Sequence, residues 1–362
     1  METMIRIHLP LLVPFALLAS LSAQNDLRGI SFAGSAYALQ SSTGSGSQIG
    51  TTGVAGLNAM AKVGNTLVSV SSGSALVAID PFTGAGTTIV TLSPALNSVR
   101  GLATTPQGVL YALQDAGTTS QPDRLHTIDP TTGVTTLIGL ASHNGLQGLC
   151  SDLVGQLYAW DVGPGTGIGV GLVAVDPLTG ASTDVNPGVG NAVDIQCLAV
   201  SPAGVLYGGR SSLFTLDVTT GVATLVGTGG YTDLRGMEFV LEASCSQFNG
   251  SGVNPLVCSC ASLPLLGSTW NFNVTPGPST VLTLVFLATS ALPVPVPLFG
   301  GEALIAPPVV DIGTGLGLHS VPLPSDPTLA GFTLFGQGLR LNGGAAGLQI
   351  ELTNGLFASL GF

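Results

Sequence analysis

Short stretches in which apolar and polar residues alternate fill most of this chain. One run reads VLYALQ, then RLHTID, then VTTLIGL, between Val109 and Leu140. A period of two places successive side chains on opposite faces, as in a half-buried strand, and no segment shows a helical stripe. The pattern therefore predicts an all-β protein.

Three signatures recur in a fixed order and divide the first two thirds of the chain into units. VRGLATT, GVLYALQ and LHTIDPTTG illustrate them. Most units start roughly 40 to 50 residues apart and hold four short strands, as propeller blades do. The units start at Gly29, Gly56, Gly101, Gly148, Cys197 and Gly236.

The ends of the repeat region predict how the ring closes. The unit from Gly29 has room for about three strands, and the last strand, RGMEFVLEA from Arg235, has no hairpin after it. We expect this strand to complete the first unit, which gives a five-bladed propeller without open edges. A six-bladed or imperfectly closed ring is the alternative. We expect the first strand of each unit to be innermost, because one of its faces carries small residues: Gly29, Gly101, Gly148, Cys197 and Gly236.

An Asp-Pro-x-Thr-Gly motif raises the choice between chemistry and turn formation. Asp at a strand end accepts backbone N–H bonds, Pro presets φ, and Gly supplies the residue of positive φ that closes a bulged hairpin. Turn physics explains the motif completely, so we interpret the repeated carboxylates as structural. They are Asp80, Asp129, Asp176 and Asp217.

Beyond Leu241 the repeat stops and longer strand-like runs follow, separated by Pro and Gly. They predict an antiparallel β-sandwich. The expected organisation is a signal peptide over 1–23, a β-propeller over 24–243, a cysteine-containing linker over 244–262 and the sandwich over 263–362. Cys245 is expected to pair with Cys258 or Cys260, whereas Cys150 and Cys197 are expected to be buried thiols.

Composition and the N-terminus indicate the compartment. Arg6, an apolar run and small residues ending near Ala23 form a typical secretory signal peptide. Only 7% of residues are charged and the net charge is -11, with no basic run, which argues against nucleic acid and anionic membrane surfaces. No membrane span is expected. We therefore expect a monomer that is secreted or held at the cell surface, with a periplasmic location as a further option.

The repeat GVLYALQ…LHTIDPTTGVTTLIG resembles propeller repeats of secreted bacterial proteins that are grouped as domains of unknown function, over about residues 28 to 241. The tail, with PLLGSTWNFNVT and GLQIELTNG, is similar to a β-sandwich module appended to many secreted bacterial proteins. The resemblance implies a display or placement role for the tail. It implies no site residues.

Candidate chemistry gathers where the inner strands begin. If these strands surround a channel, one mouth carries acids, guanidinium groups and amides that could bind a polar ligand. The alternative is that they form salt bridges between blades, as repeated positions in repeat proteins usually do. The candidates are Asp26, Arg28, Arg100, Gln147, Asp194, Gln196, Asp233 and Arg235.

The function expected from the sequence is non-catalytic binding or surface structure, with a glycan or an envelope protein as partner. No cofactor, metal site or catalytic residue is expected. The alternative is a glycan-active hydrolase that uses Asp26, Asp194 and Asp233, although the arginines beside them would hold these carboxylates ionised.

Overall fold

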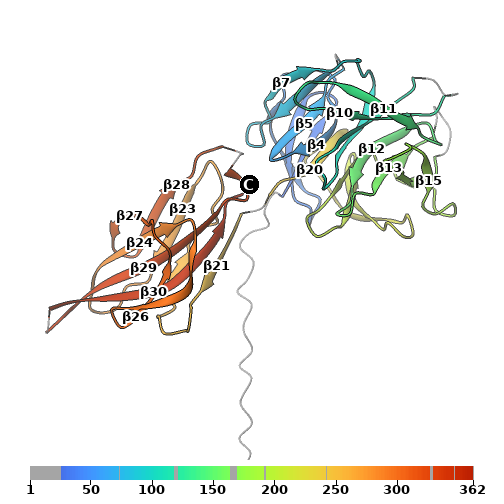
Figure 1. Ribbon diagram of the computed structural model, residues 1–362. Coiled ribbons are helices and arrows are strands. Elements are labelled where there is room, and N and C mark those ends of the chain that lie inside the picture. Colours follow the sequence, from blue (N-terminus) through green and yellow to red (C-terminus); the bar gives the residue numbers. More distant parts are fainter. Residues whose placement is uncertain are drawn as a thin grey trace, which may run out of the picture.

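The computed structural model describes residues 26–72, 74–117, 121–163, 169–190, 193–241, 243–326, 329–345 and 347–361. The signal peptide expected over 1–23 lies outside these residues. Within them the regular elements are strands, and the predicted all-β class is confirmed. The strands form two units that lie side by side (Figure 1).

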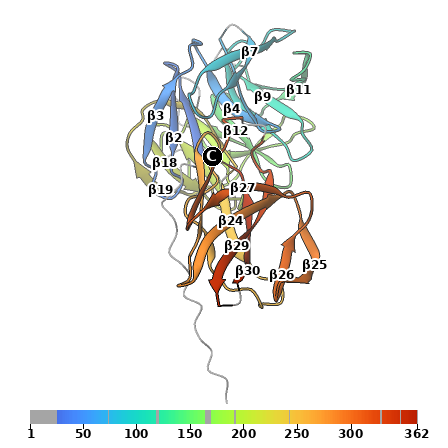
Figure 2. The ribbon, with the colours of Figure 1, turned by 90° about the vertical axis from the view of Figure 1, so that its left-hand side faces the viewer.

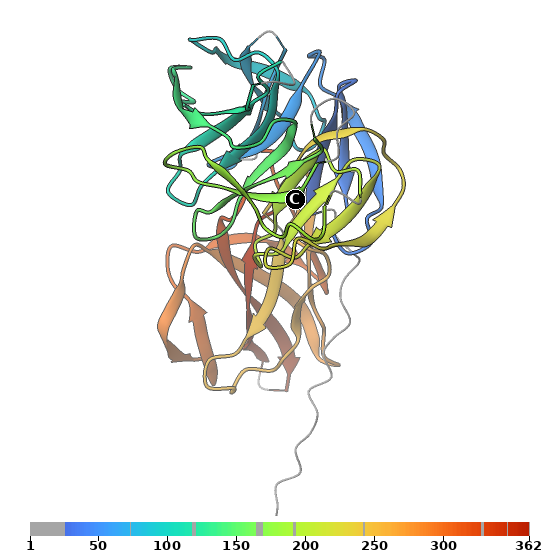
Figure 3. The ribbon, with the colours of Figure 1, turned by 90° about the vertical axis from the view of Figure 1, so that its right-hand side faces the viewer.

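The N-terminal unit contains five four-stranded antiparallel sheets in the described residues. Their innermost strands contact one another in a closed ring, in the order β20, β4, β8, β12 and β16, so the unit is β-propeller-like (Figure 3). The sheets, each from its innermost strand outward, are β20 (Leu234–Phe239), β1 (Leu27–Ser31), β2 (Ser35–Leu39) and β3 (Gly46–Thr51); β4 (Asn58–Val63), β5 (Thr66–Val70), β6 (Ala75–Ile79) and β7 (Gly86–Thr91); β8 (Val99–Thr104), β9 (Leu110–Gln114), β10 (Arg124–Ile128) and β11 (Thr135–Leu140); β12 (Leu146–Ser151), β13 (Leu157–Asp161), β14 (Gly171–Val175) and β15 (Ser182–Asp184); β16 (Cys197–Val200), β17 (Leu206–Gly209), β18 (Ser212–Leu216) and β19 (Ala223–Thr228).

One strand of the first sheet comes from the far end of the repeat region. β20 pairs antiparallel with β1, with Gly29 opposite Met237 and Ile30 opposite Gly236. The expectation that the Gly29 strand is innermost is therefore wrong, because β20 takes that place and β1 becomes the second strand of its sheet. The first sheet thus joins both ends of the repeat region, and its inner strand closes the ring by contacting β4 and β16.

Small residues allow the inner strands to approach closely. A Cβ on Gly101 would lie 2.6 Å from the carbonyl carbon of Gly148, and one on Gly148 would lie 3.0 Å from that of Cys197. A Cβ on Gly236 would lie 2.5 Å from the carbonyl carbon of Ala59. These contacts identify equivalent positions in the ring, and Ala59 on β4 is one of them.

The C-terminal unit has its own sheets (Figure 2). The segment 244–262, expected to be a linker, contains two of their strands, β21 and β22. The sheets, in strand order, are β21 (Ser244–Phe248), β30 (Gly347–Ser359), β29 (Thr333–Gly344), β24 (Thr280–Ala288) and β27 (Val310–Gly315); β22 (Cys258–Cys260), β23 (Thr269–Val274) and β28 (Leu318–Pro322); β25 (Ala291–Leu298) and β26 (Gly301–Ile305).

The five cysteines form one disulfide and leave three free thiols. Cys245 on β21 forms the disulfide with Cys260 on β22, while Cys150, Cys197 and Cys258 are buried free thiols.

Apolar residues of both units form one buried cluster, which includes Met60 and Trp270. The units are therefore packed against each other.

Candidate functional site

The repeated aspartates lie in turns and bind their own backbone. Each carboxylate accepts hydrogen bonds from backbone N–H groups within three residues, for example from Thr131 N at 2.8 Å and Thr132 N at 3.2 Å in the case of Asp129. These bonds and those from neighbouring hydroxyls lower the pKa of Asp129, Asp176 and Asp217. These carboxylates therefore have a structural role in the turns. The corresponding bonds are made by Asp80, Asp176 and Asp217.

Five polar side chains occupy one equivalent position at the start of the inner strands. Each directly precedes a residue that makes the close ring contact described above. We call this set the Asn58 mouth. It consists of Asn58, Arg100, Gln147, Gln196 and Arg235.

Asn58 is the member that the sequence analysis missed. The unit start expected at Gly56 places Ala55 in the polar position, but the contact between Gly236 and Ala59 moves the register by three residues to Asn58. The pattern Leu-Asn-Ala-Met was visible as a polar residue between apolar ones. Its match to Leu-Arg-Gly-Met in the last unit would have given the correct alignment.

Asp26 and Arg28 lie elsewhere, so their placement at this mouth is wrong. Because β1 runs antiparallel to β20, the start of β1 lies beside the end of β20, where the backbone oxygen of Asp26 accepts from Val240 N at 3.0 Å. The Asp26 carboxylate accepts bonds from the backbone N and hydroxyl of Ser41. The Arg28 guanidinium donates to the carbonyl oxygen of Pro81 at 2.7 Å, and burial lowers its pKa to about 10.

The remaining acids belong to an ion-pair chain on one side of the mouth. Arg210, which the sequence analysis did not single out, lies 2.5 Å from Asp194 and 3.1 Å from Asp233. Asp233 also pairs with Arg235 at 2.9 Å, and Arg235 donates to Gln196 Oε1 at 2.9 Å. This chain links β16 and β17 to β20, so the expected salt bridges between sheets are present here. On β8, which is separated from β20 by β4 in the ring, Arg100 pairs with Asp115 at 3.0 Å.

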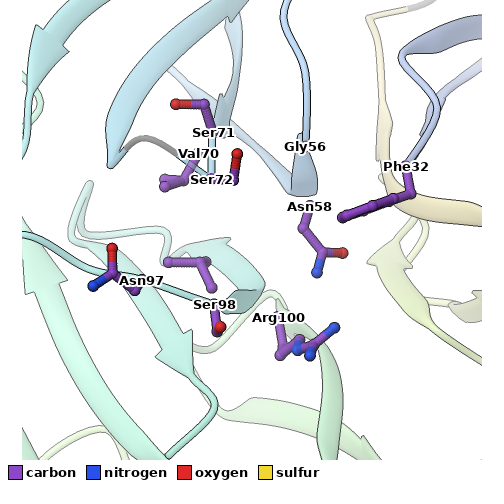
Figure 4. Close-up of a pocket in the computed structure, with 10 residues that line it drawn as sticks. Phe32, Gly56, Asn58, Val70, Ser71, Ser72, Asn97, Ser98 and Arg100 are labelled. Atoms are coloured by element: carbon purple, nitrogen blue, oxygen red, sulfur yellow. The ribbon is translucent and has the colours of Figure 1, made fainter. Parts of the chain in front are cut away.

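A pocket of about 310 Å³ opens beside Asn58 and Arg100. Figure 4 shows Phe32, Asn58 and Arg100 around the same space, and the Phe32 side chain is 49% exposed. The guanidinium carbon of Arg235 lies 5.7 Å from the centre of the Phe32 ring, a distance at which a cation attracts an aromatic face. An exposed aromatic ring is thus held next to polar groups.

Two buried acceptors of the mouth have no hydrogen-bond partner. Asn58 is 6% exposed and Gln147 is 8% exposed, yet Asn58 Oδ1 and Gln147 Oε1 accept no hydrogen bond from the part of the chain that the structure describes. An unpaired buried polar atom costs about 1–3 kcal/mol. Both oxygens can accept a hydrogen bond from a hydroxyl group.

Backbone strain accumulates at the same place. Non-glycine residues of positive φ are uncommon, and three of them flank the mouth: Ala59 at 74°, Ser98 at 55° and Asp233 at 52°. Ladder irregularities between Asn58 and Ala61 and between Gln147 and Cys150 redirect the inner strands at this level. Strain and bulges of this kind are typical of binding and catalytic sites.

The described residues bear on three further expectations. The three carboxylates of the hydrolase alternative do not meet in one pocket, because Asp26 lies at the opposite end of β20 from Asp233. Across these same residues, no group of three or more His, Cys, Asp or Glu side chains is placed to hold a metal. None of their segments forms a helix long and apolar enough to cross a bilayer.

No family model and no curated protein matches the sequence. A crystal structure of the computationally designed Ika8 protein is similar with a TM-score of 0.32 and 15% identity, over 58% of this chain and 63% of that chain. A gluconolactonase from Xanthomonas campestris is similar with a TM-score of 0.37 and 12% identity, over 56% of this chain and 75% of that chain. The match thus spans less than two thirds of the Ika8 chain, and similarities this low say nothing about the activity of this protein.

Proposed function

We propose that this protein is an exported, non-catalytic glycan-binding protein whose ligand site is the Asn58 mouth of a five-bladed propeller, with a C-terminal β-sandwich as its attachment module. Export is supported by the N-terminal leader pattern and by the Cys245–Cys260 disulfide. Five blades are supported by the closed ring in which each of the five inner strands contacts its two neighbours.

The observation that carries the ligand class is the unpartnered acceptor Asn58 Oδ1 in the same pocket as the exposed ring of Phe32, with Gln147 Oε1 as a second unpartnered acceptor on the inner strand β12. A sugar presents hydroxyl groups that donate to amide oxygens such as Asn58 Oδ1 and Gln147 Oε1. Its C–H face packs against an aromatic side chain such as Phe32. The guanidinium of Arg100, half-buried at the pocket, adds donors for ring oxygens or a sugar carboxylate.

Binding is favoured over hydrolysis by the charges. A glycosidase needs two carboxyl groups that face the scissile bond at a defined separation. Asp194 and Asp233 both pair with the same guanidinium, that of Arg210. Both carboxylates therefore point to a shared cation rather than to two sides of a substrate bond.

The test is a glycan-array screen of the mature protein followed by titration calorimetry with each glycan that binds. Phe32→Ala and Asn58→Ala are each expected to weaken binding at least tenfold. Phe332→Ala is the matched control, because Phe332 is similarly exposed, at 45%, but belongs to the C-terminal unit. Asn58→Ala should melt at no lower temperature than the wild type, because Asn58 Oδ1 accepts no hydrogen bond within the described residues. A folded wild type that binds no glycan would overturn the proposal.

A further inference from the structure

A second, larger pocket lies at the other end of the inner strands. It has a volume of about 480 Å³, and all five inner strands contribute to it. We call it the Glu238 pocket. Its lining includes Lys62 of β4, Thr104 of β8, Cys150 and Ser151 of β12, Val200 of β16 and Glu238 of β20.

Glu238 is the one large side chain in a set of equivalent positions. On the other inner strands, the residues two positions after the close ring contact are small: Ala61, Ala103, Cys150 and Ala199. Among these five equivalent positions, only Glu238 brings a charged side chain to the pocket. The exposed residues Pro106 and Gly108 at the rim connect it with solvent.

The charges that line this pocket are not paired with each other. Glu238 Oε1 accepts a hydrogen bond from Phe239 N at 2.9 Å, but within the described residues Glu238 and Lys62 form no ion pair within 4.0 Å. The positive charge of Lys62 nevertheless acts to lower the pKa of Glu238 without direct contact. Thr104 Oγ1 is buried at the same pocket and has no hydrogen-bond partner in the described chain.

We propose that the Glu238 pocket binds a small zwitterion of the amino-acid class, with the ligand ammonium group at Glu238 and the ligand carboxylate at Lys62. A ligand with only a positive charge would meet Lys62 unfavourably, and one with only a negative charge would meet Glu238 and Asp152. A zwitterion places a charge of opposite sign beside both Glu238 and Lys62, and Thr104 Oγ1 supplies a further hydrogen bond. The site is separate from the Asn58 mouth and does not depend on the glycan proposal.

Proton linkage gives the binding a characteristic pH dependence. Burial raises the pKa of Glu238 to about 7, against the field of Lys62 and the hydrogen bond from Phe239. An ammonium group binds the ionised carboxylate, so affinity rises as pH increases from 6 to 8. Three other charged or titratable groups lie near Glu238. Burial raises the pKa of Cys150 on β12, so its thiol stays neutral in this range, whereas Asp152 in the following turn contributes negative charge. Arg28 lies opposite Glu238 on β1.

The experiment is titration calorimetry of the mature protein with a panel of free L-amino acids, with methylamine and acetate as single-charge probes. At least one amino acid is expected to bind, and both single-charge probes at least tenfold more weakly. Glu238→Gln and Lys62→Met are each expected to reduce the affinity at least tenfold, and Glu238→Gln also to abolish its rise between pH 6 and 8. Glu351→Gln in the C-terminal unit is the matched control and should bind as the wild type does.

Three results would overturn the proposal. They are no binding of any amino acid to the folded wild type, binding of methylamine as tight as that of the best amino acid, and tighter binding in Lys62→Met. Phe32→Ala at the other end of the ring is expected to bind amino acids normally. Loss of glycan binding alone would therefore count against the first proposal and leave this one standing.

Discussion

Gly236 of β20 lies directly against Ala59 of β4, and a Cβ at position 236 would stand 2.5 Å from the carbonyl carbon of Ala59. This contact joins the last strand of the repeat region to the second sheet. Because the obstacle is backbone, a side chain here can be accommodated only if two strands move apart.

Gly236→Ala is accordingly expected to lower the free energy of unfolding by about 3 kcal/mol, as overpacking of a tight core does. Gly188→Ala is the matched control, since among the described residues a Cβ there would meet only Asn186 Oδ1, at 3.4 Å. Urea unfolding followed by tryptophan fluorescence measures both variants. Equal stability of the two would contradict the close contact between β20 and β4.

Arg210 is expected to contribute modestly to stability and more to the arrangement of the mouth. It pairs with Asp194 and Asp233, and the side chains concerned are partly exposed to solvent. Exposed pairs of this kind contribute about 0.2–1 kcal/mol and are screened by salt. Arg210→Met should therefore lower stability by less than about 1 kcal/mol in dilute buffer, and by less still in 1 M NaCl. Thermal melts at the two salt concentrations measure this, and a salt-independent loss would point to packing instead.

How far the sequence predicts the molecule depends on the kind of interaction. Local turn chemistry was readable, because the partners of Asp129 lie two and three residues away in the chain. Pairing of the last strand with the first sheet was also readable, since an unfinished unit and a spare strand require each other. The sequence did not show that β20 lies nearer the axis than β1, because alternation alone does not say which of two neighbouring strands is the inner one.

The residues of the Asn58 mouth were predicted only in part, because not all of them follow the repeat register of the sequence. Arg100, Gln147, Gln196 and Arg235 follow the repeat register, so the sequence brought them together. Asn58 was missed because its repeat is degenerate. Asp26 and Arg28 share the motif of the inner strands, but β1 runs in the opposite direction to β20 and places them at the other end. Glu238 was visible as the only charge among small residues, but its significance requires the ring.

The disulfide between Cys245 and Cys260 is expected to stabilise the C-terminal unit. It joins residues separated by 15 positions, and closing a loop of about that length in the unfolded chain is worth about 3 kcal/mol. Cys245→Ser should lower the melting temperature in calorimetry. Dithiothreitol should lower it in the wild type but not further in the variant, and an additional loss in the variant would mean that another disulfide exists.

The protein is expected to be more stable at mildly acidic pH than at pH 8. Burial raises the pKa of Glu238 from 4.5 to about 7 and that of Asp123 from 3.8 to about 6. Each folded-state pKa lies above the unfolded value, so between pH 4 and 7 the folded chain binds more protons, and stability falls as pH rises through this window. Glu238→Gln removes the upper part of this loss because its amide stays neutral. The variant should exceed the wild type by about 1–3 kcal/mol at pH 8, with a smaller difference at pH 4.5. Urea unfolding at the two pH values measures it, and a constant difference between variant and wild type would show that the Glu238 carboxyl is not desolvated in the folded protein.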